Sequence, residues 1–210
     1  MYYTTLESIL ISITLLFAIA NLKAMAGTFY CVIGCTLRWK ENINLENSVK
    51  LSLERNLTTI ILFVPVILVA AHYRLFNPCF SQGWSEFAML ALTSGAMIFY
   101  TILRTVAKAF AKPRQMNRTQ FEAASKSWAN YFILCAAIIL ISSGICSFTD
   151  TPESVTKSVL LYETSAVFCL FIFRKWQILK NSCALLPTIL YLCALEILPA
   201  AFLVSAAIFF

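Results

Sequence analysis

Residues and motifs that many enzymes need are scarce in this chain. His72 is the only histidine, so a metalloprotease of the HExxH type, which needs two, is excluded. There is no GxSxG turn for a serine nucleophile and no GxxxxGK[ST] loop for a nucleotide phosphate. We therefore predict no catalytic residue and no cofactor, and the sequence does not favour an enzyme.

Metal ligands are missing in any usable spacing. The 8 cysteines include no CxxC pair, and with a single histidine we predict no metal site. We expect Cys135, Cys169 and Cys193 to be small apolar packing residues. Cys79 and Cys146 both fall near one predicted face of the membrane, where a disulfide is conceivable, but linkage cannot be derived from sequence alone.

Flexible and charged residues are also few. Only 5 glycines and 6 prolines occur among 210 residues, so no long linker or low-complexity segment is present. Charged residues make up 12% of the chain, against about 25% in soluble proteins. Hydrophobic residues make up 60%, and the mean hydropathy is +0.79. A soluble core of this size could not bury so much apolar surface, so lipid must be its main partner.

The abundant hydrophobic residues form six long segments. Each matches the roughly 17 to 25 residues with which a helix crosses a bilayer. They lie at about 6–22, 57–73, 85–105, 129–148, 155–173 and 184–209. No basic residue precedes the first segment, as one would in a signal peptide, so we interpret it as a retained anchor. The sequence predicts an all-α polytopic membrane helix bundle of six spans, with residues 1–210 as a single membrane domain.

Lysine and arginine alternate between the connecting stretches. Fourteen of the 16 lie in or beside the stretches at about 23–56, 106–128 and 174–183, whereas the two others hold only Arg74 and Lys157. Because cytoplasmic loops retain Lys and Arg, we predict both ends outside, in the inner membrane of a bacterium. The net charge of +6 is explained by this orientation and by anionic lipid, so no nucleic-acid partner is predicted.

Two of the basic stretches are long enough to meet a soluble protein partner. The first half of 23–56 is apolar but too short to span, so we expect it to extend the first helix or to lie along the inner surface. Its second half, ENINLENSVKLSLER, predicts a cytoplasmic helix. The candidate basic surface of the two stretches consists of Arg38, Lys40, Lys108, Lys112, Arg114 and Arg118.

Two acids fall well inside predicted spans, Glu163 in the fifth and Glu196 in the sixth, at what we expect to be a similar depth. A charge at the bilayer centre costs roughly 2.5–3.5 kcal/mol, so such residues face the bundle interior and have partners. They could form a proton relay, or they could be neutral carboxyls that hydrogen-bond between helices. Because no basic residue is expected at that depth, we favour the neutral carboxyls. The candidate polar neighbours are Tyr162, Tyr191, Thr93 and Ser94.

Pro65 lies near the middle of the second predicted span and Pro199 near the middle of the sixth. Proline lacks a backbone donor, and its ring clashes with the carbonyl four residues earlier. We therefore predict a disturbed helix at each, the second one beside Glu196.

The segment YLCALEILP, residues 191–199, resembles the hallmark of a Bacteroidota family of multi-span inner-membrane proteins that carries a domain-of-unknown-function label. The match covers about nine residues, and length and hydropathy extend it loosely over the chain. The resemblance implies that Glu196 and Pro199 are family features. It implies no activity, substrate or cofactor.

Three functions are compatible with these features. We favour a non-catalytic protein that assists assembly, envelope biogenesis or secretion through its basic cytoplasmic segments. The first alternative is a small proton-coupled transporter or permease that uses Glu163 and Glu196. The second is a lipid-modifying enzyme in which Arg104, Lys108 and Arg114 hold a phosphate. Substrate, partner and oligomeric state are left open by the sequence.

Overall fold

The computed structural model describes residues 5–78, 83–110, 118–180 and 185–209, and within these residues it contains helices and no strand. Its framework is four long helices: α4 (Val49–His72), α5 (Glu86–Phe110), α6 (Arg118–Phe148) and α7 (Glu153–Lys180). Each is long and apolar enough to cross a membrane. They correspond to the predicted segments 57–73, 85–105, 129–148 and 155–173, and each extends beyond them.

The first predicted span is shorter than expected and is followed by a sharp bend. Helix α1 (Thr5–Ala20) has 16 residues, and α2 (Leu22–Leu37) turns away from it by 79°. Asn21 stands at the bend, and its side-chain amide donates a hydrogen bond of 2.9 Å to the carbonyl of Phe17. Counting the bent pair as one span gives five candidate spans, so the sixfold crossing predicted from sequence is not confirmed. The bend also shows that α2 does not extend α1 in a straight line.

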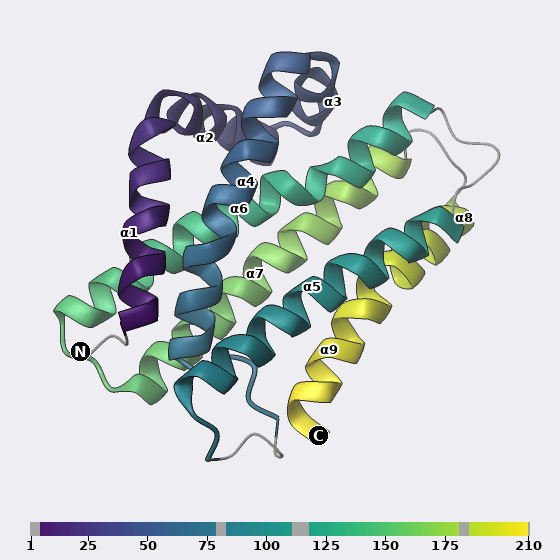
Figure 1. Ribbon diagram of the computed structural model, residues 1–210. Coiled ribbons are helices and arrows are strands. Elements are labelled where there is room, and N and C mark those ends of the chain that lie inside the picture. Colours follow the sequence, from purple (N-terminus) through teal and green to yellow (C-terminus); the bar gives the residue numbers. More distant parts are fainter. Residues whose placement is uncertain (1–4, 79–82, 111–117, 181–184, 210) are drawn as a thin grey trace.

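The predicted helix within residues 41–55 is split in two. Extended backbone at Arg38 and Ser48 delimits α3 (Trp39–Asn47), a short polar helix that precedes α4. We call the end of the bundle that carries α3 the α3 end. The last turn of α7, the last turn of α5 and the first turn of α6 also lie there, whereas α1 begins and α9 ends toward the opposite end (Figure 1).

The last predicted span is interrupted. It comprises α8 (Leu185–Leu192), a π-helical turn η2 (Cys193–Ile197) and α9 (Leu198–Phe209). The apolar helix described here, Thr188–Phe202, is shorter than a full span. The wide turn immediately precedes Pro199, which cannot donate to the carbonyl of Leu195, and it carries Glu196. The interruption that we predicted at Pro65 as well is absent, because α4 continues as one α-helix through that residue.

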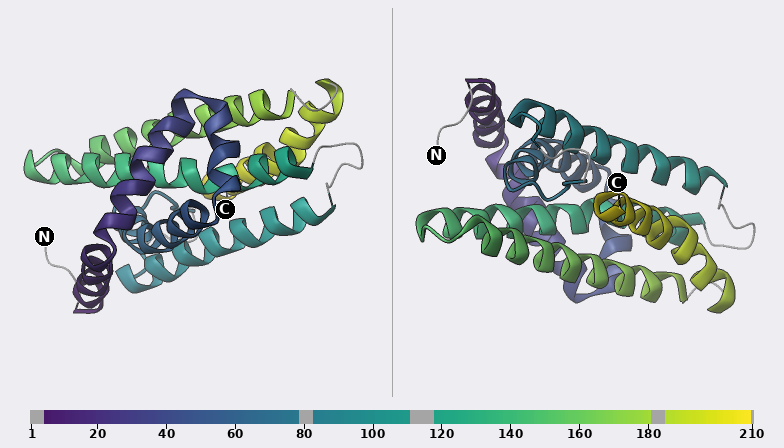
Figure 2. Two further views of the ribbon diagram at one scale, coloured as in Figure 1. Left: turned by 90° about the horizontal axis from the view of Figure 1, so that it is seen from above. Right: turned by 90° about the horizontal axis from the view of Figure 1, so that it is seen from below.

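Helix α6 is the centre of the bundle. It packs along α7 and against α4 and α2, and Figure 2 shows α6 and α7 side by side in both views. One core cluster joins α2, α4 and α6, and a second joins α6, α7 and η2 near the α3 end. Large apolar side chains on α1, α5 and α9 remain exposed, as lipid-facing positions do. In the described residues α5 packs against α4, α9 and η2 but barely touches α6.

Candidate functional site

Glu196 is fully buried and paired with two cations. Arg104 of α5 donates from Nε to both carboxylate oxygens, at 3.1 and 3.0 Å, and from Nη2 to Oε1 at 2.8 Å. Lys175 of α7, itself fully buried, donates to Oε1 through Nζ. We call Glu196, Arg104 and Lys175 the Glu196 triad. It joins the π-turn to two long helices that precede it in the chain by 92 and 21 residues.

Each cation of the triad has a further contact. The Nη2 group of Arg104 also donates to the carbonyl of Ser125 on α6, at 3.3 Å, and the guanidinium lies 5.4 Å from the ring centroid of Trp128. The Lys175 nitrogen lies 5.6 Å from the ring centroid of Phe171. Arg104 therefore links α5 to α6 where the two helices otherwise hardly meet, and a π face lies near each cation.

These contacts correct the sequence interpretation of Glu196. We expected no basic residue at its level and therefore a neutral carboxyl, whereas two cations surround it. Of the proposed neighbours, Tyr162 is 77% exposed, and the hydroxyl of Ser94 donates to the carbonyl of Ala91 in its own helix. Thr93 is buried, with no partner for its hydroxyl in the described part of the chain. The side chain of Tyr191 lies outside the described residues.

Glu163 has a different environment. The hydroxyl of Ser142 on α6 donates to its Oε1 at 2.6 Å, and its Oε2 is buried with no partner among the described residues. Glu163 precedes Lys175 by twelve residues on α7, which is about 18 Å along the helix axis. Because Glu196 lies against Lys175, the two acids are at different levels, and the expectation of a shared depth is wrong.

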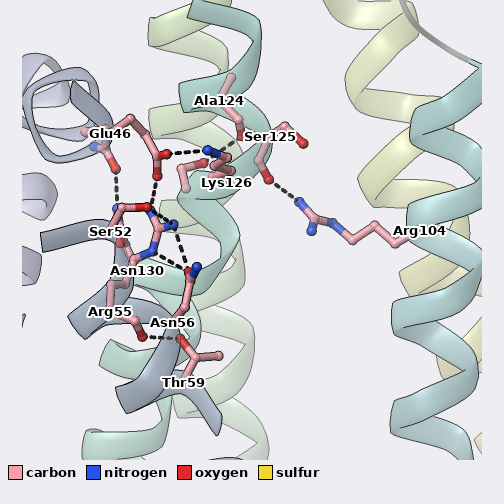
Figure 3. A network of polar contacts seen from close by, with 12 residues as sticks. Glu46, Ser52, Arg55, Asn56, Thr59, Arg104, Ala124, Ser125, Lys126 and Asn130 are labelled. Atoms are coloured by element: carbon pink, nitrogen blue, oxygen red, sulfur yellow. Dashed lines mark hydrogen bonds and ion pairs between the residues drawn. The ribbon is translucent and has the colours of Figure 1, made fainter. Parts of the chain in front are cut away.

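A second ion network lies at the α3 end (Figure 3). Glu46 of α3 contacts Arg55 of α4 through Oε1, and its Oε2 lies 2.9 Å from Nζ of Lys126 on α6. Arg55 is 1% exposed and also donates to Oδ1 of Asn56, at 3.0 and 3.3 Å, and to the hydroxyl of Ser52 at 3.3 Å. We call Glu46, Arg55 and Lys126 the Glu46 network. It fixes the short polar helix α3 to the bundle.

A neighbouring amide pair supports the same junction. The side-chain amide of Asn130 donates to Oδ1 of Asn42 at 2.8 Å, and that of Asn42 donates to the carbonyl of Cys35 at 3.2 Å. Both asparagines are buried. Their bonds join α6, α3 and α2 and satisfy both side-chain NH2 groups, whereas Oδ1 of Asn130 is buried with no partner among the described residues.

A groove of about 350 Å³ lies between the two networks, bounded by α4, α5 and α6. Its polar lining includes three cations, Arg55, Arg104 and Lys126, three threonines, Thr59, Thr101 and Thr105, and also Asn56 and Ser125. Both networks therefore contribute cations to one surface depression. No carboxylate is among its lining residues in the described part of the chain.

The residues of the basic surface predicted from sequence differ in their exposure, and the structure does not describe all of them. Arg38 and Lys40 are exposed, and Lys108 is half-buried within the electrostatic influence of Arg104 and Lys126. Three members fall, wholly or in their side chains, outside the described residues: Lys112, Arg114 and Arg118. Cys79 of the suggested disulfide also falls outside them, and Cys146 is half-buried. The described residues include no group of three or more His, Cys, Asp or Glu side chains that could hold a metal ion.

The sequence interpretation missed the partners of Glu196, although a signal was present. Lys175 follows Val167 and Phe171 at intervals of four and precedes Ile178 and Leu179, and all five are buried on one face of α7. Arg55 stands similarly in line with Thr58 and Leu62 on α4. We had explained Lys175 and Arg55 by the positive-inside rule, as residues that mark cytoplasmic loops. That explanation overlooked the fact that each lies on an apolar face of its helix.

Comparison with known proteins identifies no relative. No family model matches the chain, and no curated protein or solved structure is significantly similar to it. The site must therefore be interpreted from its own chemistry. That chemistry is two buried ion networks and a cation-lined groove, with no metal cluster in the described residues.

Proposed function

We propose that this chain is a non-catalytic protein of the bacterial inner membrane that assists assembly, envelope biogenesis or secretion. It would cross the membrane six times, with both ends outside and the α3 end on the cytoplasmic side. The alternating direction of the long helices and the clustering of lysine and arginine at the α3 end support this orientation. The exposed side of α2, α3 and the start of α4 would then meet a soluble partner.

The observation that favours a scaffold over a proton relay is the pairing of Glu196 with two cations. A relay carboxylate must gain and lose a proton, but Glu196 is held by Arg104 and Lys175 in a buried cluster with one cation in excess. Glu163 lies about 18 Å along the helix axis from Lys175, the residue of α7 that contacts Glu196, so it is not part of this cluster. Proton-coupled transport therefore remains the weaker alternative. A fixed ion cluster that joins three helices suits a rigid framework.

Partner capture tests the proposal. The full-length protein, tagged at its C-terminus, is expressed at native level, cross-linked in cells and purified in mild detergent. We expect one partner at constant stoichiometry, and we expect Lys50→Glu to reduce its recovery because Lys50 is exposed beside α3. Lys157→Glu makes the same charge change at the opposite end and should have no effect. Recovery of the chain alone, or equal losses in both variants, would contradict the proposal.

The orientation has its own test. A C-terminal reporter that is active only outside the cytoplasm should be active, and a fluorescent reporter that matures only in the cytoplasm should stay dark. The reverse result would place the α3 end outside and would remove the proposed binding surface from any cytoplasmic partner.

A further inference from the structure

We infer that the groove between α4, α5 and α6 binds the phosphate of an anionic membrane phospholipid. The inference goes beyond the proposed scaffold role and rests only on the long helices lying in a bilayer. It is carried by three features of the groove: its excess of positive charge, its hydroxyl groups and the apolar surface beside it.

The first feature is the balance of charge. The Glu46 network and the Glu196 triad each combine two cations with one carboxylate, so each has one positive charge in excess. Two further charges of opposite sign, Lys108 and Glu122, lie within electrostatic range of one another and of this region. Arg55 and Lys175 are almost or fully buried, where an uncompensated charge is costly. An anion in the groove would compensate both networks at once.

The second feature is the supply of hydrogen-bond donors. Arg104 projects from α5 across to α6 on one side of the groove, while Lys126 and Arg55 lie on the other (Figure 3). A guanidinium is suited to phosphate because its fork of N–H groups can bind two oxygens together. The hydroxyls of Thr101 and Thr105 now donate 2.7 Å bonds to carbonyls one turn earlier, and a hydroxyl hydrogen can rotate toward a new acceptor.

The third feature argues for a lipid as the source of that phosphate. Ile60 of α4 lines the groove and is 68% exposed, and Ile102 and Val106, 56% and 46% exposed, follow the lining residues Thr101 and Thr105 on α5. The groove lies at the α3 end, and the Trp128 ring is part of its lining, as expected at headgroup depth. A phospholipid could place its phosphate in the groove and its acyl chains along these side chains. Basic pockets between membrane helices hold anionic headgroups in this way.

The test uses the full-length protein, delipidated in a neutral detergent. Phosphatidylglycerol, phosphatidylcholine with the same acyl chains, glycerol phosphate and inorganic phosphate are titrated separately. The readouts are the thermal unfolding midpoint and the lipid retained after gel filtration. We expect phosphatidylglycerol to raise the midpoint and to be retained, and the other three to have little effect at the same concentration.

Two variants assign the effect to the groove. Lys126→Gln removes a half-exposed groove cation and should weaken phosphatidylglycerol binding about fivefold, the typical contribution of one basic residue near an anionic surface. Lys50→Gln removes the same charge from an exposed position outside the groove and should leave binding unchanged. Should Lys126→Gln fail to fold, Thr105→Val serves instead, because it removes a groove hydroxyl at nearly constant volume.

Each of the following outcomes would overturn the inference. Equal effects of phosphatidylglycerol and phosphatidylcholine would show that the groove does not select an anion. An equal effect of glycerol phosphate or inorganic phosphate would show that the ligand is a soluble phosphate. Equal losses in the Lys126 and Lys50 variants, or unchanged binding in the groove variant that folds, would show that net charge alone attracts the lipid. Partner capture does not depend on these results, so the scaffold role can fail or stand separately.

Discussion

Glu163 and Glu196 are the same residue type in comparable hydrophobic segments, yet the fold treats them differently. Glu196 is fully buried and receives bonds from Arg104 and Lys175, whereas Glu163 is half-buried and accepts one bond from Ser142. The difference lies in residues distant along the chain, since Arg104 precedes Glu196 by 92 positions. The hydropathy around an acid thus indicates that it needs a partner, and the fold decides whether that partner is a cation or a hydroxyl.

The comparison also separates two ways of holding helices together. The Glu163–Ser142 bond joins two neighbouring helices that already pack along each other. The Glu196 triad joins α5, α7 and the π-turn, and Arg104 reaches α6 as well. We therefore expect the two acids to differ in their effect on stability by several kcal/mol, and the following substitutions test that difference.

Glu196→Gln should have the largest effect. The amide keeps the shape of the carboxylate but leaves the buried Lys175 and the partly buried Arg104 without this counter-charge. Breaking a buried ion pair by removing one partner typically costs about 3–5 kcal/mol. The free energy of unfolding, measured by SDS titration in mixed micelles, should fall by that amount. Glu86→Gln, at the exposed start of α5, is the matched control and should change it little. A Glu196→Gln protein of unchanged stability would mean that the triad does not hold the helices together.

The fold class was predictable from composition, and the site was not. Segments such as TIILFVPVILVAA and YFILCAAIILIS are long and apolar, and helices that satisfy their own backbone groups are the common solution in lipid. The bend after α1 agrees with the alternative in which the segment from residue 23 lies along the inner surface rather than extending the first helix. Its position at Asn21 could not be predicted, because one asparagine in a hydrophobic run is a weak signal. The disturbance at Pro199 was expected because it follows from the missing N–H group, but its form as a π-turn depends on the packing around it.

The partners of Glu196 could not be predicted in the same way, because pairing depends on which helices become neighbours. Arg104 was assigned as a marker of the cytoplasmic end of its span, and it also neutralises a buried acid. Charge-pattern rules explain where a basic residue is allowed but not which residue it contacts. A buried-face pattern, such as that of Lys175 between Phe171 and Ile178, is the one local sign that a basic residue points inward.

Lys175→Met should have a smaller effect than Glu196→Gln, although it removes a fully buried ion. The triad has one cation in excess, so Glu196 keeps its two-oxygen contact with Arg104 when Lys175 is lost. Methionine suits the apolar surroundings formed by Phe171 and Ile178. We expect a loss of about 1 kcal/mol or a slight gain, because apolar replacement of buried ions is often neutral. In the background of Glu196→Gln, the same substitution should recover part of the lost stability. If the two substitutions were simply additive, the two side chains would not be coupled.

Glu163→Gln should have the smallest effect and so completes the contrast. Glutamine retains an oxygen that accepts the 2.6 Å bond from Ser142, and its amide can donate where the carboxylate oxygen now has no partner among the described residues. Hydrogen bonds between membrane helices contribute about 0.6 kcal/mol on average, so we expect a change of no more than that in the SDS titration. Ser142→Ala should cost a similar amount, and the double variant should cost no more than the larger single effect. A loss comparable to that of Glu196→Gln would show that Glu163 is ionised and paired with a cation, and the difference between the two acids would then disappear.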